Sequence, residues 1–189
     1  IVIDDVGIDH KRSARAIDLP AGVTLAFLPY ANNVAAQAAL AQQKGHELMV
    51  HLPMEPSRMT ANPGPDYLGV GHSAEELEKR IARNLEAFSG YKGVNNHMGS
   101  RATSDPAIML PVLEEVKRRG LSFVDSRTSP YSVADGLAAR FINRQQRQSV
   151  RQIRVKQQPV IGQQILAGDL QAPTERLTGS EDLRRKVEQ

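Results

Sequence analysis

The feature of this sequence that most limits its fold is an alternation of short apolar runs with longer amphipathic stretches, which continues to about residue 140. Runs this short cannot be assigned to strand or buried helix by periodicity alone, so the segments between them decide the assignment. Those segments have helical patterns, and the apolar runs are therefore expected to be strands. The five expected strands cover residues 1–5, 23–28, 47–52, 93–96 and 121–125.

Three of the intervening stretches carry signals for where a helix begins and ends. Each follows a residue of the Asn, Ser or Asp type that can cap a helix, and two are followed by a glycine. The expected helices start after Asn33, Ser73 (the capping box SAEE) and Asp105, which precedes Pro106, and the first and third end at Gly45 and Gly120. Strands that alternate with helices predict parallel β/α units and an α/β fold.

Composition limits the class of protein and the kinds of site. The chain has 189 residues, 40% hydrophobic and 24% charged, which suits one globular domain. No apolar run approaches the length of a membrane span. The absence of cysteine excludes disulfides, thiolate zinc sites and a cysteine nucleophile, so any metal must be held by imidazole and carboxylate. No GxxxxGK[ST] loop occurs, which disfavours a nucleotide-binding enzyme.

The sequence changes character after Arg140. Residues 141–189 contain ten glutamines, and their 9 Lys/Arg against 5 Asp/Glu make them basic. With Phe141 as their one aromatic residue they do not resemble a nucleic-acid interface. We therefore divide the chain into a β/α domain, 1–140, and an atypical Gln-rich basic segment, 141–189. Within that segment we expect strands at 150–155 and 159–166 and a helix at 180–188. Because Ile1 is not a methionine, we expect upstream sequence, including any targeting segment, to be missing.

Polar residues with useful chemistry occur where four of the expected strands end. They are Asp4-Asp5, His51, Asn95-Asn96-His97 and Asp125-Ser126-Arg127. Ligands collect at the carboxyl ends of parallel strands, because side chains there are presented on a rigid frame. The shared position of these residues predicts one functional site.

Each of these residues also has an ordinary structural interpretation. An Asp-Asp pair at a strand end often caps the next loop, and a lone histidine there is more often a hydrogen-bonding residue than a ligand. Two histidines on neighbouring strands with an aspartate nearby favour a metal site, because His/His/Asp leaves a position open for water. By contrast, we interpret His10, His46 and His72 as surface residues.

Five segments occur in an order that resembles a known family. They are IDDVG (3–7), TLAFLPY (24–30), HLPMEP (51–56), GVNNHMGSR (93–101) and DSRT (125–128). Together they closely resemble the divergent polysaccharide deacetylase family, a branch of the enzymes that remove N-acetyl or O-acetyl groups from polysaccharides. The resemblance covers roughly residues 1–140.

The resemblance implies a distorted β/α barrel with a metal-dependent site for acetyl hydrolysis. Carried over to this sequence, it makes Asp5, His51 and His97 the ligands of a divalent ion, most suitably zinc, and Asp4 the general base on water. It also implies an acetylated polysaccharide or oligosaccharide as substrate, and a periplasmic or secreted location. Further candidates for the site are Glu55, Asn96, Arg101, Asp125 and Arg127.

Two departures from the family pattern leave alternatives open. Where ordinary deacetylases have a second histidine four residues after the first, this chain has Glu55, which either adds a ligand or fixes the turn. The family's late histidine motif, a candidate general acid, is also missing, since no histidine follows His97. The alternatives to a deacetylase are a non-catalytic carbohydrate- or cell-envelope-associated protein that keeps the scaffold, and another metallohydrolase such as an esterase or amidase.

Two further points stay open in the sequence. Five strands do not close a barrel, so either residues 141–189 supply the remaining strands or the sheet is open, and we expect an open, incomplete barrel. The chain has no tryptophan to stack on a sugar. Tyr30, Tyr67 and Tyr91 are candidates for that role, although packing within loops is their commoner use.

Overall fold

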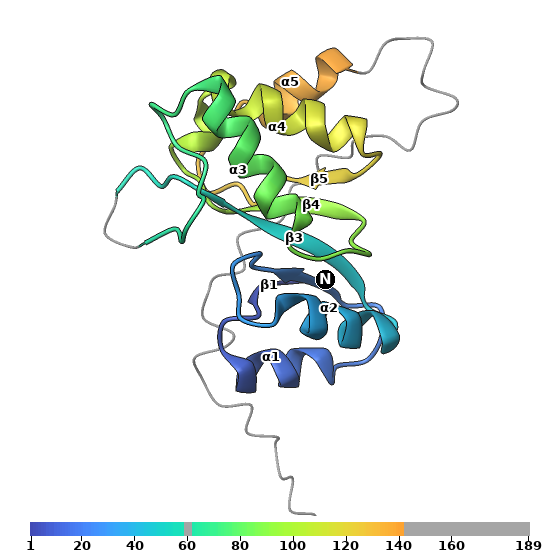
Figure 1. The fold of residues 1–189 in the computed structure, drawn as a ribbon. Helices are drawn as coiled ribbons and strands as arrows, with labels where there is room; N and C mark the ends of the chain where they lie inside the picture. The colour runs from blue at the N-terminus through green and yellow to red at the C-terminus, as the bar shows by residue number, and fades with distance from the viewer. Residues whose placement is uncertain (59–61, 142–189) are drawn as a thin grey trace, which may run out of the picture.

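A computed structural model of the chain describes residues 1–58 and 62–141 (Figure 1). Its described part contains one parallel sheet of five strands in the order β1-β2-β3-β4-β5. The strands are β1 (Val2–Val6), β2 (Thr24–Phe27), β3 (Glu47–Met54), β4 (Gly93–Met98) and β5 (Ser122–Val124). The five expected strands and the α/β class are therefore confirmed. Strands β3 and β4 each continue two residues further than expected, so His97 lies within a strand rather than just after it.

Helices alternate with these strands along the chain. They are α1 (His10–Ile17), α2 (Val34–Gln43), α3 (Ala74–Glu86), the short 3-10 helix η1 (Ala102–Ser104), α4 (Pro106–Arg118) and α5 (Ala134–Phe141). Helices α2, α3 and α4 correspond to the three expected helices. Helices α1 and α5, of eight residues each, were not predicted from the sequence.

The capping residues explain most of the helix starts. Ser73 accepts a hydrogen bond from the backbone N–H of Glu76 at 3.2 Å, and Asp105 accepts one from Ala107 at 2.8 Å. Asn33 does not behave as expected, because its backbone is left-handed (φ 55°) and its side chain caps nothing. It precedes α2 as a turn residue, a conformation that asparagine tolerates well.

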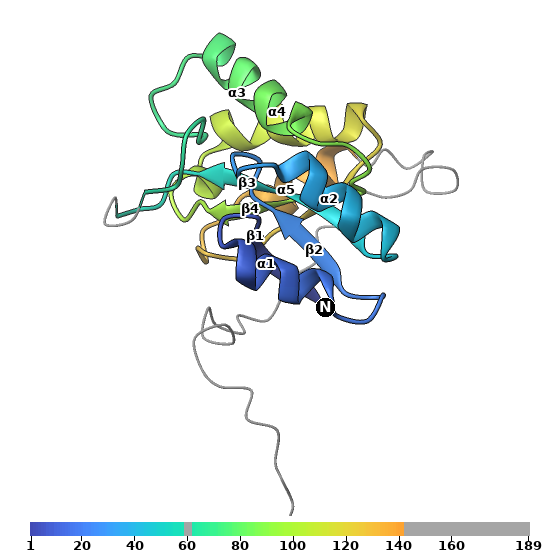
Figure 2. The ribbon, with the colours of Figure 1, turned by 60° about the horizontal axis from the view of Figure 1, so that its bottom comes forward.

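The sequential strand order places all helices on one side of the sheet. Each parallel crossover is right-handed, so a sheet built in one direction receives every helix on the same face. The main core contains buried side chains from that face, such as Leu25, Val50 and Phe123, packed against all five α-helices. Figures 1 and 2 show α1 and α2 beside one end of the sheet and α3 and α4 beside the other.

The opposite face of the sheet has a different lining. Its apolar residues are Ala26, Met49 and Val124, with Val2 packed against them. Helices outside and a small apolar cluster inside are the layers of a β/α barrel wall. Within the described residues the sheet does not close, since β1 and β5 each pair with one neighbour. The described part is therefore a distorted, incomplete barrel, as expected.

One prediction about the histidines is wrong. His46 is not a surface residue: it is 4% exposed, and its ring nitrogens lie 2.9 Å from the carbonyl oxygen of Val23 and 3.0 Å from that of Ile17. The imidazole joins the end of α1 to the start of β2, which sequence spacing alone does not reveal. No described helix combines the length and apolar character needed to cross a membrane. The elements expected at 150–155, 159–166 and 180–188 lie outside the described residues.

Candidate metal centre

Asp4 and Asp5 are neighbours on β1, and in a regular strand their side chains would face opposite sides of the sheet. The backbone of Asp5 is left-handed (φ 59°), and the pairing of β1 with β2 shifts register between Ile3 and Val6, as at a β-bulge. Aspartate is among the few residues other than glycine that adopt this conformation readily. The bulge turns Asp5 back, so that Oδ1 of Asp4 and of Asp5 lie 3.9 and 3.3 Å from ring nitrogens of His51.

Asp5 also reaches a second histidine. Its Oδ1 atom lies 3.3 Å from Nε2 of His51 and 2.9 Å from Nδ1 of His97, and the two rings meet edge to face with centroids 4.9 Å apart. Strand β1 is separated from β4 by two strands, which in a flat sheet would hold them about 14 Å apart. The contact between Asp5 and His97 therefore depends on strong curvature of the sheet toward its inner face.

Asn95 connects these groups, a role that was not predicted although Asn95 was named among the polar residues at the strand ends. Its Oδ1 atom lies 2.9 Å from Nδ1 of His51, and its Nδ2 donates to Oδ1 of Asp4 at 2.7 Å. Because an amide oxygen only accepts, Nδ1 of His51 carries a proton and donates it to Asn95, and Nε2 is directed at Asp5. Second partners of this kind orient the histidines of metal sites.

The site is polarised even without an ion. Burial opposes ionisation of Asp5, but hydrogen bonds and the charges of His51 and His97 outweigh it and hold the pKa of Asp5 far below its usual range. Burial likewise opposes protonation of His51, yet Asp5, the charge of Asp4 and the amide of Asn95 raise the pKa of His51. The His51 side chain is 4% exposed and that of Asp5 46%, so the cluster opens to solvent at its carboxylate.

The donor set fits a divalent transition metal. Ligand atoms of Asp5, His51 and His97 all lie within 4.8 Å of one another. Among the described residues, these three form the group of His, Cys, Asp or Glu side chains that lie close enough together to hold a metal ion. A tetrahedral ion with bonds of about 2.0–2.1 Å separates its ligand atoms by about 3.3 Å. The observed separations of 2.9 and 3.3 Å need little adjustment. Two imidazoles and one carboxylate suit zinc and similar ions.

Glu55 does not belong to this cluster. Its side chain accepts hydrogen bonds from Nη1 of Arg101 at 2.8 Å and from the backbone of Val70 at 2.6 Å. Its carbonyl oxygen accepts from the backbone of Arg101 and of Ala102, both at 3.1 Å. Of the two roles left open, the structure shows Glu55 fixing the turn after His97. Arg101 takes part in the same contacts, because both its side chain and its backbone N–H donate to Glu55.

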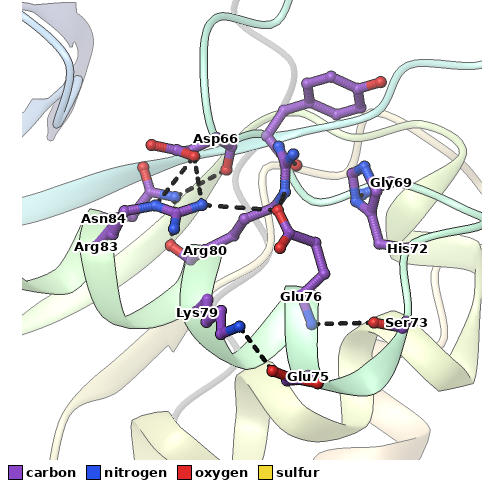
Figure 3. A network of polar contacts seen from close by, with 11 residues as sticks. Asp66, Gly69, His72, Ser73, Glu75, Glu76, Lys79, Arg80, Arg83 and Asn84 are labelled. Atoms are coloured by element: carbon purple, nitrogen blue, oxygen red, sulfur yellow. Dashed lines mark hydrogen bonds and ion pairs between the residues drawn. The ribbon is translucent and has the colours of Figure 1, made fainter.

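The connection from β3 to α3 is also held by polar contacts, which Figure 3 shows. Oδ1 of Asp66 accepts two hydrogen bonds from Arg83, at 2.7 and 3.1 Å, and its carbonyl oxygen accepts one from Asn84 at 3.0 Å. Arg80 donates to the carbonyl of Tyr67 and lies over its ring. Hydrogen bonds from side chains of α3 therefore hold Asp66 and Tyr67 of this connection against the helix.

The remaining candidates are Asn96 on β4, and Asp125 and Arg127 just after β5. Asn96 donates to the carbonyl of Met98 at 2.8 Å and accepts from the backbone of Ser126 at 2.8 Å. Alternation along β4 places Asn96 on the face opposite Asn95 and His97. Asp125 is 1% exposed and accepts from the backbone of Arg127, whose own φ is 53°. The structure does not bring these three residues together with Asp5.

Similar proteins have been found among solved structures and curated sequences. A crystal structure of an uncharacterized protein from Agrobacterium tumefaciens C58 matches with a TM-score of 0.71 and 33% identity, over 74% of this chain and 57% of that one. An uncharacterized protein of Haemophilus influenzae is 35% identical over 73% of this chain and 49% of its own length. The uncharacterized protein YibQ of Escherichia coli is 32% identical over 76% of this chain and 46% of its own. The chain thus spans about half the length of these curated relatives.

The family assignment follows from a broader match. A family model described as divergent polysaccharide deacetylase matches residues 1–151, most of the chain and somewhat more than the 1–140 expected from the motifs. That range contains Asp4, Asp5, His51 and His97. The chain belongs to the divergent polysaccharide deacetylase family.

Proposed function

We propose that this protein is a metal-dependent hydrolase that removes acetyl groups from a sugar polymer. The observation that carries the proposal is the convergence of Asp5, His51 and His97 on one point, with Asp4 held beside them by Asn95. Membership of the divergent polysaccharide deacetylase family supports a polysaccharide as the substrate class. The periplasm or the cell exterior, where such polymers occur, is the location that we propose.

Asp5, His51 and His97 would hold the divalent ion, for which zinc is the best fit to the donor set. Such an ion acidifies water and polarises a carbonyl, the two effects that hydrolysis of an acetyl group needs. The bond from Asn95 to His51 keeps Nε2 directed at the ion site. The bulge at Asp5 supplies the third ligand without displacing Asp4.

Asp4 is the proposed general base. Its Oδ1 atom is occupied by Asn95, and the side chain is 32% exposed, so a carboxylate oxygen can reach water beside the cluster. Asp4 takes a proton from the attacking water as the oxygen bonds to the acetyl carbon. The bond from that carbon to the sugar nitrogen or oxygen then breaks, acetate leaves, and the proton passes to the leaving atom.

The test compares metal content with acetate release. Purified full chain is expected to bind one divalent ion and to release acetate from acetylated chito-oligosaccharides. Changing His51 and His97 together to alanine should abolish both, whereas Asp4→Asn should keep the metal and lose acetate release. Wild-type protein that binds metal and these sugars without releasing acetate would show the non-catalytic carbohydrate-binding protein instead. Wild-type protein without bound metal would contradict the proposal.

A further inference from the structure

Tyr30 lies in the loop that follows β2. This loop packs against the chain just after Asp5, because a Cβ atom added to Gly7 would lie 2.6 Å from Cβ of Ala31. In the sheet β2 is between β1 and β3, which carry Asp5 and His51. The first residue of the loop is hydrogen-bonded to the end of β1, because the backbone N–H of Leu28 donates to the carbonyl of Val6 at 2.9 Å. The ring of Tyr30 is half-buried at this edge of the sheet.

The β3–α3 connection closes against the same ring. A Cβ atom added to Gly64 would lie 2.4 Å from Cε1, 2.5 Å from Cζ and 2.9 Å from Oη of Tyr30. The bare backbone of Gly64 (φ 97°) therefore covers the hydroxyl-bearing edge of the ring, and its N–H is fixed by Asn62 at 2.9 Å. Gly64 thus confines the ring of Tyr30 on this side.

The hydroxyl of Tyr30 has a proton to donate. No hydrogen bond to it occurs within residues 1–58 and 62–141. Burial, and then the negative charge of Asp5, raise the pKa of Tyr30, so the phenol keeps its proton near neutral pH. Asp5, whose charge acts on this phenol, is a carboxylate and supplies no competing donor.

We propose that Tyr30 is a further catalytic residue, whose hydroxyl donates a hydrogen bond to the carbonyl oxygen of the acetyl group as water attacks. This assignment rests on the proposed function. Negative charge develops on that oxygen in the transition state, and a fixed donor there is worth far more than one in water. The hydroxyl would add to the polarisation of that carbonyl by the ion.

The direct test is Tyr30→Phe, which keeps the ring against Gly64 and removes only the hydroxyl. We expect kcat for acetate release to fall about 100-fold with KM within about threefold of wild type, the pattern for a lost oxyanion donor. Metal content should be unchanged. Tyr131→Phe is the control, because Tyr131 is 78% exposed. If Tyr30→Phe leaves kcat unchanged while Tyr30→Ala raises KM, the ring is a sugar platform and the proposal is overturned.

A second pair of variants tests the contact with Gly64. Gly64→Ala pushes a methyl group into Tyr30 and is expected to lower kcat as Tyr30→Phe does. Gly71→Ala carries the same backbone strain, with φ 95°, but its methyl group meets open space. Equal kcat values for the two alanine variants would contradict the claim that Gly64 confines Tyr30.

A binding experiment separates this assignment from the proposed function. Acetohydroxamate presents an acyl oxygen to a metal, and its affinity for zinc-loaded full chain is measurable by calorimetry without turnover. We expect Tyr30→Phe to weaken it about tenfold, the value of one hydrogen bond. If wild type releases no acetate but shows this difference, the proposed function fails, whereas Tyr30 remains a hydrogen-bond donor to an acyl oxygen at the metal. Equal affinities in both proteins would overturn the assignment of Tyr30.

Discussion

Asp5 and His97 are 2.9 Å apart, between Oδ1 and Nδ1, although two strands separate β1 from β4. A second contact spans the same distance across the sheet, from Nδ2 of Asn95 to Oδ1 of Asp4 at 2.7 Å. Both require a sheet that curves tightly around its inner face. The curvature that makes the described part a barrel wall is therefore also what assembles the site.

Asp5→Asn removes the negative charge of this residue and keeps a side chain that tolerates its left-handed backbone. Asparagine tolerates the left-handed backbone, so the free energy of unfolding should stay near that of wild type. Loss of a residue that only hydrogen-bonds to a metal ligand typically lowers metal affinity about 10–100-fold. Because Asp5 is itself a proposed ligand, zinc affinity should fall by more than about 100-fold. Asp5→Ala should add a conformational cost of about 1–2 kcal/mol. Calorimetric zinc titration and chemical denaturation measure the two effects, and unchanged affinity in Asp5→Asn would remove Asp5 from the ligand set.

Asn95 and Asn96 are adjacent buried amides with different expected roles. Asn95→Ala removes the partner that orients His51 and Asp4, so zinc affinity should fall about 10–100-fold. Asn96→Ala removes the contacts that hold Ser126, so the free energy of unfolding should fall by about 1–3 kcal/mol with zinc affinity retained. Zinc titrations on the two folded variants compare them. The same loss of affinity in both would show that Asn95 has no special role.

Glu55→Gln tests whether Glu55 only fixes the turn through Arg101 and Val70 or is a ligand of the metal. The variant loses the charged hydrogen bond from Arg101, so the free energy of unfolding should fall by about 1–3 kcal/mol. Zinc affinity should remain within about twofold of wild type, because in the structure the carboxylate bonds to Arg101 and Val70 rather than to the cluster. A tenfold loss of affinity would make Glu55 a ligand after all.

Glu115 should make stability depend on acid pH. Hydrogen bonds from Arg118, followed by those from Arg119, outweigh burial and lower the pKa of Glu115 from 4.5 to about 2. A lowered folded pKa means that its stabilisation is complete above pH 4.5 and is lost as the pH falls toward 2. The side chain is 19% exposed and partly screened, so the contribution is at most about 1 kcal/mol.

The comparison for this prediction is Glu115→Gln against wild type, by thermal unfolding from pH 7 to pH 2. Their midpoints should differ at pH 7 and converge at the acid end. Glu114→Gln is the matched control, because Glu114 is exposed on the same helix and forms no ion pair in the described structure. A difference that persists unchanged to pH 2 would exclude the ion pairs as its cause.

Much of the fold follows from local sequence signals. Asp105 and Ser73 start helices where expected, because each side-chain oxygen accepts a hydrogen bond from a backbone N–H only two or three residues later. Such a contact can be read from the neighbouring sequence. The convergence of His51 and His97 was also predictable, because the ends of parallel strands meet at one edge of a sheet. These inferences need only the neighbouring residues and the direction of the strands.

Other features depend on contacts between distant segments. The sequence pattern predicts that Asp4 and Asp5 diverge, and only the bulge in β1 brings both to His51. The burial of His46 depends on the carbonyls of Ile17 and Val23, which are far from it in sequence. Asn95 was named with Asn96 at the strand end but was left out of the further site candidates, although alternation along β4 already places Asn95 on the face of His97. That omission was avoidable, whereas the other two were not.

The measurement that tests the central claim most directly is anomalous diffraction at the zinc absorption edge, from crystals of the full chain grown with zinc. We predict one strong peak about 2.0–2.2 Å from Oδ1 of Asp5, Nε2 of His51 and Nδ1 of His97. Crystals with no peak at this position, or with the ion bound by other residues, would contradict the account.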